Sequence, residues 1–294
     1  MNNKTILKYL MLVVFLATGF SFSFAQESDG YNPNSVRPIH ESDQLYKTRL
    51  WRRMDLKEKQ NKPFFSENRE ITKVIIDAVM AGTLMPYTND SLNERMTKEQ
   101  FIENMKIPEM GGGLSEDEIA AGFGAEDTAD DGWGDAWGDT STSSAKADPA
   151  EPESYLFLPR DVTVLEIMED LIFDKERGRQ YFDMQTVTLI LPPEKFPETG
   201  LLREVATFRY KDLIEIWEQR PKEAIWVNAR NDAAHLPLQA AFDLRLHAAR
   251  VVKYSNPEDS RIIDMVDGNR RQALLESLDF EYKLMVREHE LWEY

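Results

Sequence analysis

The residues of this sequence that could carry out acid–base chemistry are carboxylates lying close together in the chain. Glu166, Glu169 and Asp170 fall within one short apolar stretch. Glycosidases place two such carboxylates on either side of the scissile bond, one as acid and the other as base or nucleophile. An exported carboxylate-based hydrolase is therefore one hypothesis. The alternative is that such pairs arise by chance in an acidic chain and are mostly solvated charges.

Other patterns typical of active sites are missing from the sequence. It has no glycine-rich phosphate loop, no His-Glu-x-x-His zinc motif and no Gly-x-Ser-x-Gly elbow. The four histidines are far apart, and we expect His289 to fill a structural role rather than act as a base. There is no cysteine, which excludes disulfides, thiolate metal sites and cysteine nucleophiles. We predict no catalytic residues, no bound metal and no cofactor.

A weak calcium-loop pattern lies in residues 127–139. An EF-hand places ligands at its first, third, fifth and twelfth positions and a glycine at its sixth. Counting from Asp127, Asp131 and Gly132 fit, whereas Ala129 and Gly138 occupy ligand positions. A calcium-responsive adaptor is thus a further hypothesis, and diffuse attraction of cations is the simpler interpretation.

The calcium-like residues belong to a longer acidic segment, residues 109–153. It holds thirteen acidic residues and one basic residue, and it therefore carries most of the net charge of −17 of the whole chain. Its small polar composition cannot bury enough apolar surface to offset the entropy of ordering, so we predict a disordered linker. Trp133 and Trp137 within it are candidate anchors for a partner, although a variable loop without a role would also tolerate them.

Residues 1–25 have the composition of an export signal. Lys4 and Lys8 precede an apolar run over residues 9–20, and small residues allow cleavage between Ala25 and Gln26. Because Gln26 is not cysteine, the exported chain cannot be acylated there. No later apolar run is long enough to span a bilayer, so we expect any membrane attachment to depend on a partner or on affinity for the membrane surface. The strongly acidic charge argues against nucleic acid as a partner.

The segment before the acidic linker is expected to hold an extended tail over residues 26–45 and a helical part over residues 46–108. Helical spacing predicts a helix over residues 67–81, and Thr97 and Gln100 form a capping box that opens another. The cluster of Arg49, Arg52 and Arg53 would either dock an acidic partner or lipid headgroups, or lie on a helix face that balances Asp55 and Glu58.

The segment after the linker, residues 154–294, is expected to mix strands and helices. Strands are predicted over 164–174, 186–192, 204–209 and 223–228, and helices over 212–218, 238–252 and 269–292. The last helix is expected to bury one apolar stripe, formed by Leu274, Leu278, Tyr282, Met285 and Trp292. The predicted fold class is α+β, with helices flanking a small, mostly antiparallel sheet.

Five strings of the sequence resemble the GldN/PorN family of gliding-motility and type IX secretion proteins of Bacteroidetes. They occupy residues 51–65, 166–178, 228–242, 254–277 and 288–294, on both sides of the acidic linker. The resemblance implies a periplasmic, non-enzymatic subunit. Such a subunit forms a ring with an outer-membrane lipoprotein of the GldK/PorK type, at the inner face of the outer membrane. It also implies coupling to the GldL/GldM-type motor, through the GldM/PorM arm.

Aromatic and arginine side chains are the residue types that most often anchor protein interfaces. On that ground we expect the contact surfaces to include Trp51, Arg52, Arg53, Trp292 and Tyr294. Packing in the core is the alternative role for Trp51 and Trp292.

Overall fold

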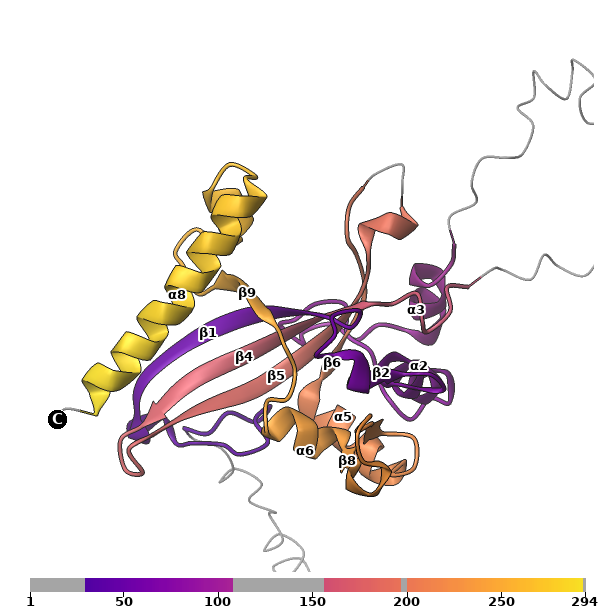
Figure 1. The fold of residues 1–294 in the computed structure, drawn as a ribbon, viewed down its shortest axis with the longest axis horizontal. Coiled ribbons are helices and arrows are strands. Elements are labelled where there is room, and N and C mark those ends of the chain that lie inside the picture. The colour runs from indigo at the N-terminus through magenta and orange to yellow at the C-terminus, as the bar shows by residue number, and fades with distance from the viewer. Residues whose placement is uncertain (1–29, 108–155, 197–199, 293–294) are drawn as a thin grey trace, which may run out of the picture.

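The computed structural model describes residues 30–107, 156–196 and 200–292. Its centre is a five-stranded antiparallel sheet with the strand order β6-β5-β4-β1-β9 (Figure 1). The strands are β1 (Gln44–Asp55), β4 (Val164–Asp174), β5 (Arg179–Leu191), β6 (Arg203–Arg209) and β9 (Arg250–Tyr254). Helices lie at both ends of this sheet, so the predicted α+β class is confirmed.

Strands β4 and β5 form the hairpin at the middle of the sheet. Every residue of β4 is buried, as expected for an apolar strand covered on both faces. The tight turn between the two strands contains Gly178 with a φ of 57°, a conformation that glycine adopts without steric cost. The predicted strands over 164–174 and 186–192 are therefore confirmed, and the second begins seven residues earlier than predicted, at Arg179.

Strand β1 replaces the start of the helical part that was predicted from residue 46. Its buried residues alternate, with Leu50, Arg52 and Met54 on one face and Trp51 and Arg53 on the other. This period of two is the pattern of a strand. The helical expectation was wrong because the buried arginine at position 52 was counted as a solvent-exposed residue.

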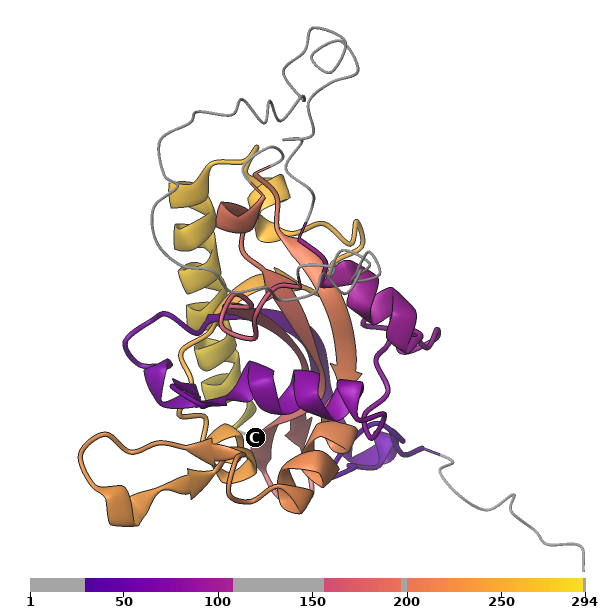
Figure 2. The same cartoon turned by 90° about the vertical axis from the view of Figure 1, so that its right-hand side faces the viewer.

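Three helices cover one end of the sheet and form the main core with it. They are α2 (Ile71–Met80), α5 (Tyr210–Gln219) and α6 (Leu238–Asp243) (Figure 2). Another helix, α3 (Lys98–Asn104), begins at the predicted capping box, in which Thr97 and Gln100 bond each other's backbone N–H groups. The predicted helix over 212–218 is confirmed, and the one predicted over 67–81 is confirmed from Ile71 onward, because residues 69–70 belong to a strand.

The remaining elements include two corrections to the predicted pattern. The predicted strand over 223–228 is reduced to β7 (Ile225–Trp226), which pairs with β8 (Leu236–Pro237) outside the main sheet. The predicted helix over 238–252 ends after α6, and its last residues belong to β9.

The shorter elements are β2 (Phe65–Ser66), β3 (Arg69–Glu70), α7 (Ile262–Met265), and the 3₁₀ turns η1 (Glu41–Asp43), η2 (Lys62–Phe64), η3 (Pro193–Lys195) and η4 (Asp232–Ala234).

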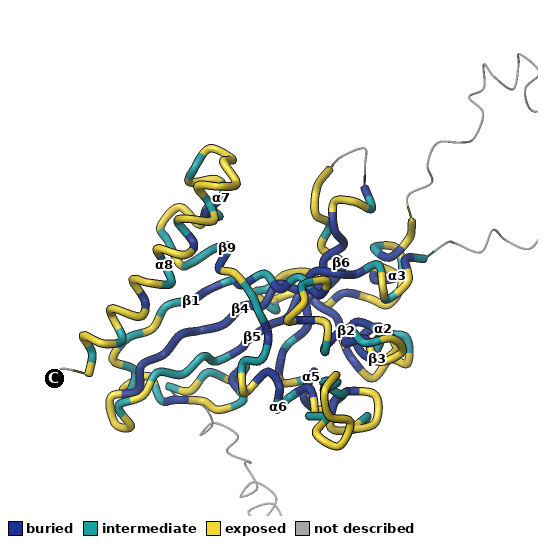
Figure 3. Tube along the Cα trace, viewed as in Figure 1, coloured by how far each residue is buried: buried dark blue, intermediate teal, exposed yellow. Residues whose placement is uncertain are grey.

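The last helix, α8 (Arg270–Leu291), packs on the other end of the sheet. Its buried residues are Ser277 and Leu284, and Phe280 stacks on Tyr254 of β9 with ring centroids 4.3 Å apart. The stripe predicted to be buried is exposed instead, as the yellow colour along α8 shows (Figure 3). The helix carries two apolar faces, and the prediction took the solvent-facing one for the core.

Several predicted features lie outside the described residues. These are the export signal with Ala25 and Gln26, the acidic segment with Trp133 and Trp137, the calcium-like residues 127–139, and Tyr294. Among the helices that the structure does describe, none is both long and apolar enough to cross a membrane.

Candidate interaction surfaces

A cluster of buried charges lies on the face of the sheet that carries both apolar cores. Glu169 of β4 has no exposed surface and accepts a hydrogen bond of 2.6 Å from Nε of Arg52. Arg245 donates to both oxygens of the same carboxylate, at 2.8 and 3.1 Å. Nη1 of Arg52 also reaches Glu281 of α8, at 2.5 Å. The cluster therefore ties β1, β4, α8 and the chain after α6 together.

The backbone at Arg245 explains how its guanidinium reaches Glu169. Helix α6 ends in a Schellman motif, in which the N–H of Leu246 bonds the carbonyl of Ala241 and the N–H of Arg245 bonds that of Phe242. Arg245 takes the left-handed position of this motif with a φ of 52°, where glycine is usual. The left-handed backbone conformation costs roughly 1 kcal/mol for a residue other than glycine. Arg245 occupies this position nevertheless, and its side chain forms the ion pair with Glu169.

The pKa of Glu169 does not suit a catalytic acid. Burial raises its pKa, but the guanidiniums of Arg245 and Arg52 more than offset that effect and hold the pKa below its usual value. A general acid working near neutral pH needs the opposite shift. Glu169 is therefore a structural anion.

The other two candidate carboxylates lie on the opposite face of the sheet and are also paired. Asp170 accepts hydrogen bonds from Arg49 at 2.7 and 3.1 Å. Glu166 accepts one from Arg53 at 2.7 Å, with Arg261 at 3.5 Å. A glycosidase needs two carboxylates that face the same substrate-binding space. Glu166, Glu169 and Asp170 do not provide such a pair.

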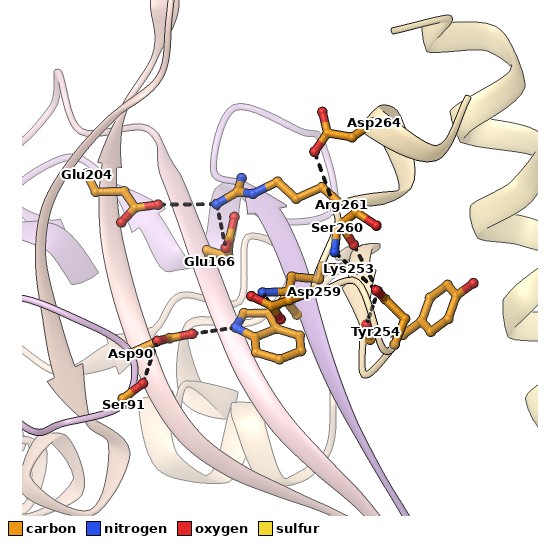
Figure 4. Close-up of polar contacts among 12 residues, drawn as sticks. Asp90, Ser91, Glu166, Glu204, Lys253, Tyr254, Asp259, Ser260, Arg261 and Asp264 are labelled. Carbon is orange, nitrogen blue, oxygen red and sulfur yellow. Dashed lines mark hydrogen bonds and ion pairs between the residues drawn. The ribbon is translucent and has the colours of Figure 1, made fainter. Parts of the chain in front are cut away.

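A cavity of about 270 Å³ lies on this second face, and we call it the Trp51 pocket. Nε1 of Trp51 donates to Asp90 at 2.8 Å, and Nζ of Lys253 lies 4.3 Å from the centre of the indole ring. Lys253 also pairs with Asp259 at 2.7 Å (Figure 4). The indole is thus held between a loop and the edge strand β9. The other residues lining the pocket are Asn89, Ser91, Glu166, Met168, Thr186, Thr188, Glu204, Thr207 and Arg261.

The floor of the Trp51 pocket is polar. Arg261 joins Glu166 and Glu204 with distances of 3.5 and 3.3 Å (Figure 4). Thr188 and Thr207 share a hydrogen bond of 2.8 Å, whereas the buried hydroxyl of Thr186 has no partner in the structure. The pocket offers hydroxyl and carboxylate groups to a polar ligand or to a side chain of a partner.

A second cavity, of about 580 Å³, lies between α8 and the residues that follow α6, and we call it the α8 cleft. The guanidinium of Arg245 lies over the ring of Phe182 in this cleft, 3.9 Å from its centre. His247 also lines it, and burial together with the positive charge of Arg245 lowers the pKa of this histidine to about 4. Its imidazole is therefore neutral at physiological pH and supplies no charge to the cleft.

The predicted contact residues fall into three different environments. Arg52 is buried in the ion-pair cluster, and Arg53 is half-buried against Glu166. Trp51 is half-buried in its pocket. Trp292 is exposed at the end of α8, edge-on to Phe173 with ring centroids 6.3 Å apart. The structure does not bring these four side chains together into one patch.

The residues of these surfaces that sequence reasoning missed include Arg245, Lys253 and Glu281. The one signal available was the cluster of arginines in β1, whose charge calls for buried acids elsewhere in the chain. Within the described ranges, no group of three or more His, Asp or Glu side chains is placed to hold a metal ion.

Comparison with known families decides the identity. The family described as gliding motility associated protein GldN matches residues 39–293, which include every strand of the sheet and all of α8. This chain belongs to the GldN family. No curated protein matches the sequence. As a GldN protein, the chain is a component of the gliding motility and type IX secretion machinery, and GldN is not known as a family of enzymes.

Proposed function

We propose that this GldN protein is a periplasmic structural subunit. In this proposal it forms a ring with an outer-membrane lipoprotein of the GldK/PorK type, and it contacts the GldM/PorM-type arm of the GldL/GldM motor. The lipoprotein holds it at the inner face of the outer membrane. The observation that carries the proposal is the family match over residues 39–293.

The start of the sequence supports an exported chain with no lipid of its own. The predicted signal ends at Ala25, and the next residue is Gln26 rather than the cysteine that lipid attachment needs. In this proposal, binding to the lipoprotein determines where the exported chain is located.

The geometry supports a role in binding rather than in catalysis. The carboxylates that could have carried chemistry are paired with arginines across both faces of the sheet. The surfaces that remain accessible include the Trp51 pocket, the α8 cleft and the outer side of α8. A large machine that assembles and transmits force needs several separate contact surfaces of this kind.

Crosslinking in intact cells tests the proposal. A photo-crosslinking residue is placed at Ser91 on the rim of the Trp51 pocket, at Gln60 beside the α8 cleft, and at Leu158 as a control that is exposed but lines neither cavity. Mass spectrometry identifies the crosslinked proteins. We expect the lipoprotein or the motor arm among the products of Ser91 or Gln60. Recovery of uncrosslinked chain alone from all three positions would overturn the proposal.

A further inference from the structure

The outer face of α8 is apolar and has no partner within the described chain. Six of its side chains are large, hydrophobic and at least one-third exposed: Leu274, Leu275, Leu278, Tyr282, Met285 and Val286. Tyr282, Met285 and Leu275 are 60, 59 and 58% exposed. A contiguous apolar surface of this kind on a folded protein marks an interaction site.

The fold of α8 itself does not require this face. The helix is held to the sheet through Leu284, Ser277 and Phe280, and through the ion pair between Glu281 and Arg52. Those residues lie on the side of the helix that faces the sheet. Leu275, Leu278 and Tyr282 point away from it and are more than half exposed, whereas Met285 also borders the α8 cleft beside Leu284. The exposed area of these side chains is left for a second surface to bury.

The spacing of the outer residues is that of a helix-pairing seam. Leu275, Leu278, Tyr282 and Met285 are separated by three, four and three positions. Continuing the same alternation reaches Arg271 at one end and His289 and Trp292 at the other. A repeat of 3.5 residues on an exposed helix is the pattern that packs against another helix in a coiled coil.

We propose that this surface binds the same surface of a second copy of the chain, with the two α8 helices antiparallel. A two-fold axis beside position 280 sets Leu275 opposite Met285 of the second copy and Leu278 opposite Tyr282. The layer of Leu278 and Tyr282 joins a smaller and a larger side chain, and the layer of Leu275 and Met285 joins two of nearly equal volume. The seam is complementary to itself in this orientation, as a two-fold interface requires.

The charges at the two ends of α8 favour the antiparallel orientation. Arg270 and Arg271 begin the helix, and Glu288 and Glu290 lie near its end. Antiparallel pairing brings each basic end beside an acidic end and also opposes the two helix dipoles. Between the two ends, Lys283 already pairs with Asp279 at 2.5 Å within the helix. Parallel pairing would place Arg271 beside Arg271 and Glu288 beside Glu288.

This contact goes beyond the proposed function and does not depend on it. A two-fold contact closes on itself and yields a dimer, so it cannot build a ring alone. A ring of GldN subunits would need a further contact on another surface. The dimer is thus a separate property of the chain, measurable in the purified protein without any other component.

The absence of cysteine from the sequence allows a direct test by disulfide trapping. The exported chain is made with Leu275→Cys or with Met285→Cys, and the two variants are oxidised separately and as a mixture. We expect a disulfide dimer from the mixture, because positions 275 and 285 face each other across the antiparallel pair. Each variant alone would give little dimer, since two copies of one position lie roughly 15 Å apart along the axis, beyond disulfide reach.

Sedimentation of the exported chain provides the second arm. We expect a dimer at micromolar concentration, monomers for Leu278→Glu, and a retained dimer for the control Leu158→Glu, which changes an exposed leucine outside α8. Circular dichroism verifies that each variant is folded. A monomeric unmodified chain, or efficient crosslinking of each single-cysteine variant with itself, would overturn the proposal. Loss of the dimer in both glutamate variants would do the same.

Discussion

Nε of Arg52 lies 2.6 Å from Oε1 of Glu169, and this pair connects the centre of the sheet to both of its helical ends. Arg52 continues to Glu281 of α8, and Glu169 continues to Arg245 beyond α6. The cluster lies between the main core and the smaller apolar cluster under α8. The position of α8, and with it the outer face that it presents, therefore depends on buried charges.

We predict that Glu169→Ala lowers the free energy of unfolding by about 3–5 kcal/mol, the usual cost of removing one partner of a buried ion pair. The substitution leaves the guanidiniums of Arg52 and Arg245 without their shared carboxylate. Urea unfolding followed by circular dichroism measures the change. The matched control is Glu194→Ala, which breaks an exposed pair with Lys57 and should cost at most about 1 kcal/mol. Equal losses in the two variants would contradict the structural role of the cluster.

We predict that Arg245→Gly is destabilising even though glycine suits the backbone at that position. Glycine relieves roughly 1 kcal/mol of strain at the left-handed φ, but the loss of the ion pair with Glu169 outweighs this gain. The control is Asp267→Gly, an exposed residue with a φ of 51°. For Asp267→Gly we expect the free energy of unfolding to change by less than about 1 kcal/mol, in the direction of greater stability. A stabilised Arg245→Gly variant would show that the pair contributes little.

We predict that Asp183→Asn stabilises the protein at neutral pH and that this stabilisation becomes smaller as the pH is lowered. Burial raises the pKa of Asp183 to about 6, from an ordinary value of 3.8. A carboxyl group with a raised folded-state pKa contributes stability at low pH, and this contribution is lost as the pH rises through about 6. The asparagine does not ionise, so its advantage over the native residue should grow between about pH 4 and pH 7. Melting temperatures of both proteins across this range test the prediction, and a constant difference would contradict it.

We predict that Trp51→Phe loosens the loop at residues 88–92. The substitution keeps an aromatic ring beside Lys253 but removes the hydrogen bond from the indole N–H to Asp90, for a cost of about 1 kcal/mol. Hydrogen exchange of this loop should become faster. The control is Trp226→Phe, because the indole N–H of Trp226 is buried and has no hydrogen-bond partner among the described residues. Unchanged exchange of the loop in Trp51→Phe would show that Trp51 does not restrain it.

Much of the fold could be predicted because local signals and tertiary packing agreed. The alternation in residues 186–191, the capping box at Thr97 and the apolar spacing of α2 each act within a few residues of the chain. The family resemblance carried the assignment to GldN, since no motif in the sequence defined a chemical site.

The parts that could not be predicted depend on contacts between distant residues. Arg52 is buried only because Glu169 and Glu281, more than a hundred positions away, neutralise it. With Arg52 buried, the inward-facing residues of β1 alternate as Leu50, Arg52 and Met54, which is the pattern of a strand rather than of the predicted helix. On α8, one apolar face meets the sheet and the other meets solvent, and periodicity alone cannot distinguish them.

The most direct test of the proposed function is the location of the chain when its lipoprotein partner is depleted. Envelopes are separated into outer-membrane and soluble fractions, and the chain is quantified in each. We predict outer-membrane recovery when the lipoprotein is present and a shift to the soluble periplasmic fraction when it is depleted. Continued recovery with the outer membrane after depletion would contradict attachment through that lipoprotein.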